Sequence, residues 1–312
     1  MTITVIIPNY NGSKIIKKNL PSVIKSVEDY KYKIIISDDF SDKTDYDELS
    51  VFIHSLIEQK IPVSLIRNKK NYGFSQTVNN AVSHTDSDLL ILLNSDVIPE
   101  RDFLKPVIPQ FMNNPKLFAV GCMDKSIENN SVVLRGRGVG SFKKGFLLHR
   151  KGDIQEDNTL WVSGGSSIVR TEIFKKIGGF DILYNPFYWE DIDLSYRAQK
   201  SGYSILFNNK SIVEHRHEEG AIKKNFSDKQ IKRIAYRNQF IFVWKNITDF
   251  SLLFQHIIYL PYHIVRAVIN RDSSFLQGLY LAIIRLPKIL QKRRKSKKLF
   301  VVTDEDILRQ FA

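Results

Sequence analysis

Short apolar runs alternate with amphipathic segments through the first part of this chain. The apolar runs, which are typical of buried parallel strands, are Ile3–Pro8, Tyr32–Ser37, Val63–Ile66 and Asp88–Leu93. Between these runs, apolar residues recur at helical spacing in segments 14–30, 46–59 and 75–83. This alternation predicts an α/β fold with a Rossmann-like, mostly parallel sheet.

Polar residues stand just after three of these predicted strands. They are Asn9-Tyr10, Asp38-Asp39 and Asp96. Ligands of α/β sheets bind beyond the carboxyl ends of the strands, so these residues are candidates for one shared site. Asp96 is well placed to hold a divalent cation, because Mg²⁺ takes oxygen ligands from carboxylates and substrate phosphates. The alternative is an ordinary turn aspartate, a role that this residue type also favours.

A second acidic stretch, Trp189-Glu190-Asp191-Ile192-Asp193, lies about a hundred residues further on. It follows an aromatic segment, 184–189, that could stack on a sugar ring and exclude water. A carboxylate beside aromatic side chains tends towards a raised pKa, which suits a general base. The alternative is a helix N-terminus, where acidic residues offset the helix dipole. Only one carboxylate is needed as the base, and we expect Asp193 to cap the helix or pair with Arg197.

The segments beyond residue 121 are less regular. A Gly- and Arg-rich stretch, 135–140, lacks the strand and helix that flank a phosphate loop, so we expect a mobile or acceptor-facing loop there. The pattern next predicts a strand at 161–170, helices at 172–176 and 191–201, and a strand at 204–207. From residue 228 onward it predicts helices at 228–246, 249–270 and 274–295. The longest apolar stretch there, Phe250–Val265, is too short to span a bilayer.

The chain of 312 residues carries a net charge of +13, which favours an anionic partner. Seven of its basic residues fall between Lys288 and Lys298. With the apolar C-terminal helices, this cluster suggests contact with an anionic membrane surface. The alternative is a solubilising tail. A nucleic-acid-binding protein is a weaker hypothesis, because no aromatic residue interleaves with the basic ones in 291–298.

The single cysteine, Cys122, excludes an intrachain disulfide and fits a reducing compartment. The first apolar stretch is too short for a signal peptide and lacks a basic region before it. These two features predict a cytoplasmic protein.

An ordered set of motifs resembles the inverting glycosyltransferases of family 2, which have the GT-A fold. The motifs, in chain order, are Val5–Gly12, Ile34–Ser41, Asn71-Tyr72-Gly73-Phe74 with Asn79-Asn80, Leu92–Asp96 (a degenerate D-x-D), Ser163-Gly164-Gly165, Gly178–Asp181, Glu190–Leu194 with Arg197, and Gly202-Tyr203 with His215. The resemblance covers residues 2–220. It implies a GT-A domain at 1–225, divided into a nucleotide-sugar-binding half (1–121) and an acceptor-binding half (122–225). Residues 226–312 would form a helical C-terminal region.

The resemblance also assigns roles to individual residues. Asp191 would be the general base with Glu190 beside it, and Asp96 would bind Mg²⁺ or Mn²⁺. The nucleotide sugar would contact Pro8, Asn9, Tyr10, Asp38, Asn71, Gly73, Phe74, Asn79, Asn80 and Ser95. The acceptor and sugar pocket would include Gly164, Gly165 and Trp189. His215 would be a further metal ligand, although His217 is an equally placed alternative.

Two positions depart from the family pattern. Asn94 replaces the first acid of D-x-D, as in the branch that resembles rhamnosyltransferases. Phe40 stands where glycine is usual, so the loop after Asp38 is expected to differ in shape.

The resemblance implies a metal-dependent hexosyltransferase. It would move a sugar from a UDP- or dTDP-linked donor to a glycan or lipid-linked acceptor of a cell-surface polysaccharide, on the inner face of the plasma membrane. The main alternative is a sugar-nucleotide nucleotidyltransferase. That class expects a Gly-rich, basic loop after the first strand, whereas here the loop is Pro8-Asn9-Tyr10-Asn11-Gly12.

Overall fold

The computed structural model describes residues 1–128, 131–216 and 226–311. The strands are β1 (Thr2–Asn9), β2 (Lys31–Asp38), β3 (Val63–Arg67), β4 (Leu89–Leu93), β5 (Val97–Pro99), β6 (Leu117–Glu128), β7 (Ser131–Arg135), β8 (Gly138–Lys143), β9 (Phe146–Lys151), β10 (Ser166–Arg170) and β11 (Ser204–Arg216). The helices are α1 (Ser13–Val27), α2 (Lys43–Glu58), α3 (Phe74–Val82), α4 (Ile108–Asn113), α5 (Thr171–Lys176), η1 (Ile182–Tyr184), α6 (Glu190–Lys200), α8 (Asp228–Asn246), α9 (Phe250–Ile269), α10 (Ser273–Ile284), α11 (Leu286–Lys297) and α12 (Asp304–Arg309).

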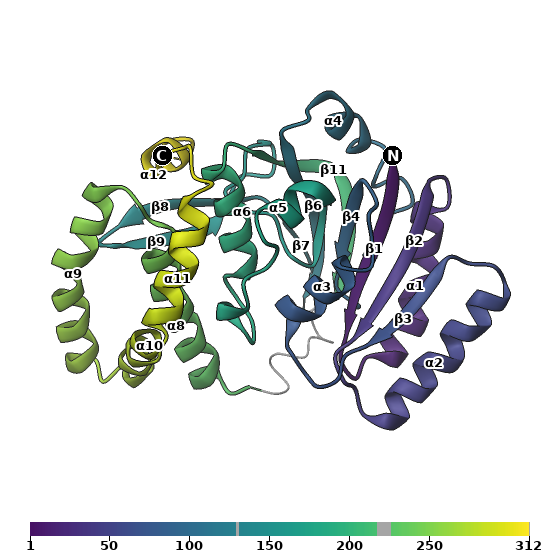
Figure 1. Cartoon of the computed structure of the whole chain (residues 1–312), viewed down its shortest axis with the longest axis horizontal. Helices are drawn as coiled ribbons and strands as arrows, with labels where there is room; N and C mark the ends of the chain where they lie inside the picture. The colour runs from purple at the N-terminus through teal and green to yellow at the C-terminus, as the bar shows by residue number, and fades with distance from the viewer. Residues whose placement is uncertain (129–130, 217–225, 312) are drawn as a thin grey trace.

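The strands β3-β2-β1-β4-β10-β6-β11-β5 form the main sheet in this order, with β7 paired to β6. Strands β1 to β4 are mutually parallel, and β11 runs parallel to β6. Strand β10 is antiparallel to both of its neighbours, β4 and β6. The mostly parallel α/β sheet predicted from the alternating pattern is therefore confirmed, and Figure 1 shows it in the right half of the molecule.

Alternate residues of the central strands fill two different cores. In β1, Val5 and Ile7 face the core covered by α1 and α2, whereas Ile6 faces the core covered by α3, α5 and α6. In β2, Ile34 and Ile36 repeat the first pattern and Ile35 the second. Because both faces are buried, these strands are continuous apolar runs, as expected for parallel strands.

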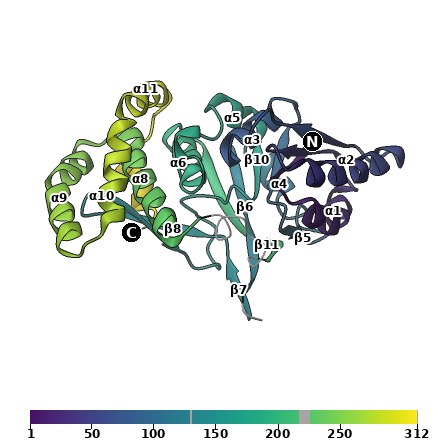
Figure 2. The same cartoon turned by 90° about the horizontal axis from the view of Figure 1, so that it is seen from below.

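The C-terminal helices share a third core with the acceptor half. It joins residues of β8, β9 and α6, such as Leu147 and Tyr196, to residues of α8 and α10, such as Phe240 and Phe275. Both views place α8 to α11 at the end of the molecule opposite α2 (Figures 1 and 2). The predicted helical extension is thus present, and it packs on residues 139–196. The division at residue 225 stays a prediction.

Three local predictions differ from the structure. The segment 135–140 is not one loop, because β7 ends at Arg135 and β8 begins at Gly138. A β-carbon on Gly138 would lie 2.3 Å from the ring of Trp161, so strand packing accounts for this glycine. The predicted helix 274–295 is two helices, because Pro287 falls in the first turn of α11. The apolar stretch that was expected to be too short to span a bilayer lies in α9, whose 20 residues are long and apolar enough to cross a membrane by length and composition alone.

Candidate active site

Asp38 and Asn9 stand at the carboxyl ends of β2 and β1 and organise the loops that follow. The Asp38 carboxylate is fully buried and accepts hydrogen bonds from the Asn9 amide (2.9 Å) and from Ser41. Asn9 Oδ1 accepts from the backbone N–H of Gly12 (3.1 Å). Asp38 therefore fixes the loops that follow β1 and β2, where the nucleoside pocket is predicted. Its contact with a base stays a prediction.

Two exposed aromatic rings lie near the same strand ends. Tyr10 is 45% exposed and Phe40 is 50% exposed. Phe40 has φ of +64°, in the left-handed region that favours glycine. Glycine, which is usual at this position, adopts such a backbone conformation more easily than phenylalanine. The expected difference in the shape of this loop stays a prediction. The guanidinium of Arg67 lies 5.4 Å from the centre of the Phe40 ring, so Phe40 is held by a cation–π contact.

Asp39 fixes the segment that follows β3, a role that the sequence did not reveal. Its carboxylate accepts from the backbone N–H groups of Tyr72 and Gly73, both at 2.8 Å, and from the Asn68 amide at 2.9 Å. Gly73 has φ of +80°, and a β-carbon there would lie 3.3 Å from Asn185. Asn185 in turn donates to the Tyr72 carbonyl (2.7 Å), which joins the donor side to the loop before α6.

The remaining residues predicted to bind the donor differ in their contacts. Asn71 Oδ1 accepts from the N–H of Gly73 (3.2 Å). The Asn79 amide is engaged by the backbone of Phe180 through two hydrogen bonds of 2.8 and 3.0 Å. Asn80 bonds to Asn68 and Gln76. Phe74 packs on Phe180, and Pro8 is half-buried on β1. Asn79 thus joins α3 to the segment before η1, and Asn80 joins α3 to the end of β3. Their contact with a donor stays a prediction.

Asp96 and His215 come together at the predicted metal position. Asp96 follows β4 and Ser95, and His215 lies on β11, where it pairs with Val97 of β5. His215 Nε2 is 3.3 Å from Asp96 Oδ2, and Nδ1 is 3.0 Å from Asp124 Oδ2. Burial acts to lower the pKa of His215, but hydrogen bonds to Asp124 and Asp96 outweigh it and raise the pKa to about 9. His217, the alternative ligand, lies outside the described residues.

This arrangement fits a divalent cation that also binds the substrate. Octahedral Mg²⁺ with ligands at ~2.1 Å places neighbouring ligands ~3 Å apart, close to the observed Asp96–His215 separation of 3.3 Å. The bond from Nδ1 to Asp124 would leave Nε2 as the ligand nitrogen. The described residues contain no cluster of three or more metal-binding side chains. A cation here would therefore take the rest of its ligands from diphosphate and water.

Glu190 and Asp191 open helix α6, and Asp191 faces the Ser163–Gly165 turn. Asp191 accepts from the N–H of Ile192 (2.8 Å) and from the backbone of Gly164. Burial raises the pKa of Asp191 to about 6, and burial together with Asp191 raises the pKa of Glu190 to about 8. Glu190 Oε2 has no hydrogen-bond partner among the described residues. Burial and the repulsion between the two groups therefore favour one ionised and one protonated carboxylate, and the lower pKa of Asp191 makes it the candidate base.

The Ser163–Gly165 turn joins the two acidic stretches. The Gly165 carbonyl accepts from the N–H of Asn94 (3.0 Å), two residues before Asp96. A β-carbon on Gly165 would lie 2.3 Å from the Asn94 side chain, so only glycine fits. Gly164 touches Asp191 on the other side. The antiparallel pairing of β10 with β4 creates this proximity.

Trp189 does not provide the sugar platform that the sequence suggested. Its ring is 6% exposed and packs against His149 and Phe242 in the third core. Both Tyr188 (φ +68°) and Trp189 (φ +76°) are left-handed, and this turns the Trp189 ring inward. Tyr188 is 43% exposed and is the available aromatic surface of that segment.

Asp193 is a structural residue, as predicted. It is fully buried and accepts from Arg197 Nε at 2.7 Å. Lys245 of α8 also donates to Asp193 and to Asp181, both at 2.7 Å. Lys292 of α11 adds a longer contact to Asp181 at 3.5 Å. This cluster of two carboxylates and three cations ties α6 to the C-terminal helices.

Comparison with protein families gives a match over residues 4–178, described as glycosyl transferase family 2. A curated relative, poly-beta-1,6-N-acetyl-D-glucosamine synthase of Staphylococcus aureus, is 27% identical over 66% of this chain and 47% of its own length. The chain spans less than half the length of the curated relatives that it matches at this level.

Solved glycosyltransferase structures have the same fold. TarS residues 1–349 from S. aureus, in complex with UDP-GlcNAc, superposes with a TM-score of 0.60 at 15% identity, over 100% of this chain and 90% of that one. GalNAc-T7, solved with UDP, GalNAc and Mn²⁺, superposes with a TM-score of 0.64 at 19% identity, over 78% of this chain and 48% of that one.

Proposed function

The chain belongs to glycosyl transferase family 2, and from this premise we propose that it is a metal-dependent, inverting hexosyltransferase. It would move a sugar from a UDP- or dTDP-linked donor to a hydroxyl of a glycan or lipid-linked acceptor. Membership of the family decides against the alternative of a sugar-nucleotide nucleotidyltransferase. One observation supports the mechanism. Asp191, whose pKa is raised, contacts the backbone of Gly164, and the next residue, Gly165, bonds to Asn94 beside the strand end that carries Asp96.

In the proposed step, Asp191 takes the proton of the acceptor hydroxyl while the hydroxyl oxygen bonds to the anomeric carbon. The bond from that carbon to the diphosphate oxygen breaks on the opposite face, and its electron pair leaves with the diphosphate. This single displacement inverts the anomeric centre. A pKa near 6 leaves Asp191 ionised at neutral pH yet basic enough to accept the proton.

Asp96 and His215 are the proposed ligands of a Mg²⁺ or Mn²⁺ cofactor. A divalent cation, when bound, neutralises the charge that develops on the leaving diphosphate. Asp124 holds the His215 ring in place through Nδ1. The presence of Mn²⁺ with GalNAc-T7 supports the use of a divalent cation.

The donor and acceptor classes rest on the relatives. TarS has been solved with UDP-GlcNAc, and the curated relative is a synthase of an N-acetylglucosamine polymer. These favour a UDP-sugar over a dTDP-sugar as donor, and a growing cell-surface polysaccharide as acceptor. The rhamnosyltransferase-like pattern around Asn94 keeps dTDP-linked donors in the screen.

We also propose that the protein is cytoplasmic and peripheral on the inner face of the plasma membrane. Lys295, Lys297 and Lys298 of the basic cluster are exposed, and α9 carries exposed apolar side chains. Anionic leaflets attract such polybasic segments. Cys122 is buried and unpaired, which agrees with a reducing compartment.

The test is nucleotide release from a panel of UDP- and dTDP-sugars, with Mn²⁺ or Mg²⁺, by wild type, Asp191→Asn and Glu190→Gln. Asp191→Asn should lower kcat by about 10²–10⁴-fold, because the amide cannot take a proton. Glu190→Gln is the matched control. The pKa near 8 keeps Glu190 protonated at neutral pH, so we expect a loss of tenfold or less.

The pH profile separates the two carboxylates further. Wild-type kcat/KM at saturating metal should rise with pH around 6, since Asp191 must be ionised to act as base. Glu190→Gln should keep this rise, and Asp191→Asn should lose it. A larger loss in Glu190→Gln than in Asp191→Asn would exchange the two roles.

A further inference from the structure

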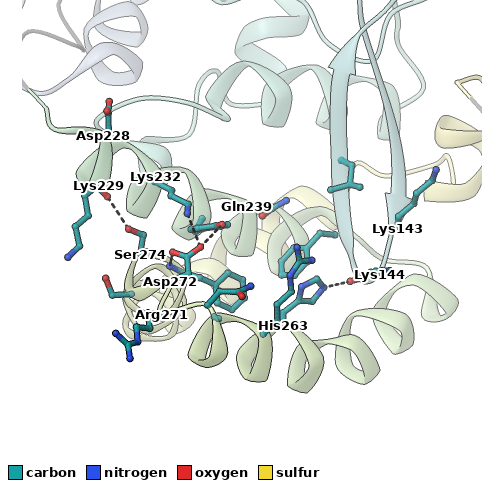
Figure 3. A pocket seen from close by; sticks show the side chains of 18 residues that line it. Lys143, Lys144, Asp228, Lys229, Lys232, Gln239, His263, Arg271, Asp272 and Ser274 are labelled. Atoms are coloured by element: carbon teal, nitrogen blue, oxygen red, sulfur yellow. Dashed lines mark hydrogen bonds and ion pairs between the residues drawn. The ribbon is translucent and has the colours of Figure 1, made fainter.

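A cavity of about 1070 Å³ lies outside the candidate active site, among the C-terminal helices. Its walls come from the tip of the β8–β9 hairpin, from α8, from the end of α9 and from the turn into α10. Figure 3 shows the labelled side chains on these elements, with Lys232 and Asp272 close together among them. No predicted catalytic, donor-binding or metal-binding residue lines it. It is therefore a separate candidate binding site.

The cavity is rich in positive charge. Six basic residues line it against two acidic ones: Lys143, Lys144, Lys229, Lys232, Arg266 and Arg271, with Asp228 and Asp272. Asp272 is already paired with Lys232 at 2.9 Å and accepts from Tyr236 Oη at 3.0 Å. Within the described part of the chain, Arg266 and Arg271 make no ion pair. Both side chains are exposed, so their guanidinium groups are accessible to an anion that enters the cavity.

Helix α9, which forms one wall, exposes its apolar side to solvent. Ile258, Val265 and Ile269 are more than half exposed and lie along its outward face, together with Phe254 and Val268. The opposite face is fixed to the β8–β9 hairpin, because His256 bonds to the Gly145 carbonyl (2.7 Å). Among the described helices, α9 alone is long and apolar enough to cross a membrane by length and composition. Its polar contacts with the hairpin instead fit a helix lying in the membrane surface.

Arg266 connects these two features. It lies in the last turn of α9, between the outward apolar face and the basic cavity. A phospholipid combines the same two chemistries, an anionic phosphate next to acyl chains. Basic pockets beside membrane-inserted apolar surface bind lipid head groups in this way.

We propose that this cavity binds the phosphate of an anionic membrane phospholipid whose acyl chains rest against the outward face of α9. The inference rests on the proposed membrane association and makes it specific. Membrane contact is then set by α9 and the cavity, and the polybasic helix α11 adds only diffuse attraction. The C-terminal helices would thereby hold the enzyme at the membrane surface from which a lipid-linked acceptor extends.

The test uses the whole chain and sedimentation with vesicles of phosphatidylcholine, with or without phosphatidylglycerol. Arg266→Gln/Arg271→Gln should weaken binding to the anionic vesicles by about tenfold or more, since each basic residue near such a surface contributes ~1 kcal/mol. Lys43→Gln/Lys60→Gln removes the same charge from exposed positions of the nucleotide half and should leave binding unchanged. Ile258→Ser/Val265→Ser should weaken binding to both kinds of vesicle.

Donor hydrolysis should stay at the wild-type level in all three variants, which keeps this test apart from that of the transferase activity. Equal losses in the cavity pair and the control pair would overturn the proposal, because net charge alone would then explain binding. Loss in the α9 pair without loss in the cavity pair would also overturn it, while leaving membrane association intact. Inorganic phosphate that bound the cavity as tightly as vesicles do would make it a site for free phosphate, and the lipid assignment would be wrong.

Discussion

His215 stands between two carboxylates that come from different parts of the sheet. Asp96 follows β4, and Asp124 lies on β6, 91 residues before His215 in the sequence. The two contacts fix the orientation of the imidazole ring before any ligand arrives. A preoriented imidazole binds a cation more tightly, because less order has to be imposed on binding.

Asp124→Ala should therefore lower the affinity for Mn²⁺ by about 10–100-fold, the usual cost of losing a partner of a ligand histidine. Binding can be measured by calorimetry in the presence of UDP, without turnover. At saturating Mn²⁺, nucleotide release should fall much less than it does in His215→Ala. Asp47→Ala, an exposed residue of α2, is the control. Unchanged Mn²⁺ affinity in Asp124→Ala would reduce Asp124 to a packing role.

Single residues also show why part of the site could be predicted and part could not. Asp96 and Asp191 stand in motifs whose order along the chain makes them candidates, and their roles stay predictions. Asp39 and Asp124 act through partners distant in the sequence, and an isolated aspartate at a strand end or inside a strand has no distinctive local pattern. The inward ring of Trp189 depends on two consecutive left-handed residues, which sequence periodicity does not reveal.

At the scale of elements, the parallel half of the sheet was predictable because both of its faces are buried. Each strand is then a continuous apolar run with recognisable ends. Strands β5 to β9 were missed, because Pro99, Gly138 and Gly140 interrupt the pattern and their pairing depends on distant partners. Strand β11 continues far beyond its predicted end through its pairing with β6.

The contact between α6 and α8 combines the apolar packing of the third core with buried charges. Burial acts to raise the pKa of Asp193, but Arg197 and Lys245 outweigh it and hold that pKa below its ordinary value. Such a lowered pKa stabilises the fold above the ordinary carboxyl pKa of ~4, and that stability is lost as the pH falls.

Lys245→Met should lower the free energy of unfolding by about 3–5 kcal/mol at pH 7, because it leaves two buried carboxylates with one cation fewer. The deficit relative to wild type should shrink as the pH falls below ~4, where the carboxylates take up protons. Urea unfolding at the two pH values measures both effects. Lys292→Met is the matched control, since the Lys292 side chain is only partly buried and lies 3.5 Å from Asp181, and it should cost less than about 1 kcal/mol. A deficit independent of pH would assign the loss to packing.

At the scale of the whole molecule, the last two helices, α11 and α12, pack on α8 and α6. Asp304 of α12 is fully buried, 3.0 Å from Lys200 of α6, and accepts from Tyr196 Oη at 2.7 Å. Arg293 of α11 donates to the carbonyls of Trp244 and Ile247. Residues beyond 285 are therefore part of the same folded unit as helix α6, which carries the proposed base.

A chain that ends at Arg285 should accordingly lose both stability and nucleotide release, although no proposed catalytic residue lies beyond His215. It would leave Lys200 buried without its carboxylate partner and expose the surface that Ile289 covers. Thermal unfolding should show one transition in wild type and a lower midpoint in the truncated chain, because the helices and the acceptor half share one core. Lys295→Gln/Lys298→Gln changes the charge of this region and keeps its packing, so it should retain the wild-type midpoint. A truncated chain with wild-type midpoint and activity would make the helices an independent appendage. In that case truncation would be a fair test of membrane binding. Because the C-terminal helices pack on the acceptor half, truncation would also destabilise the chain, so membrane binding has to be tested with the point variants of α9 and the cavity.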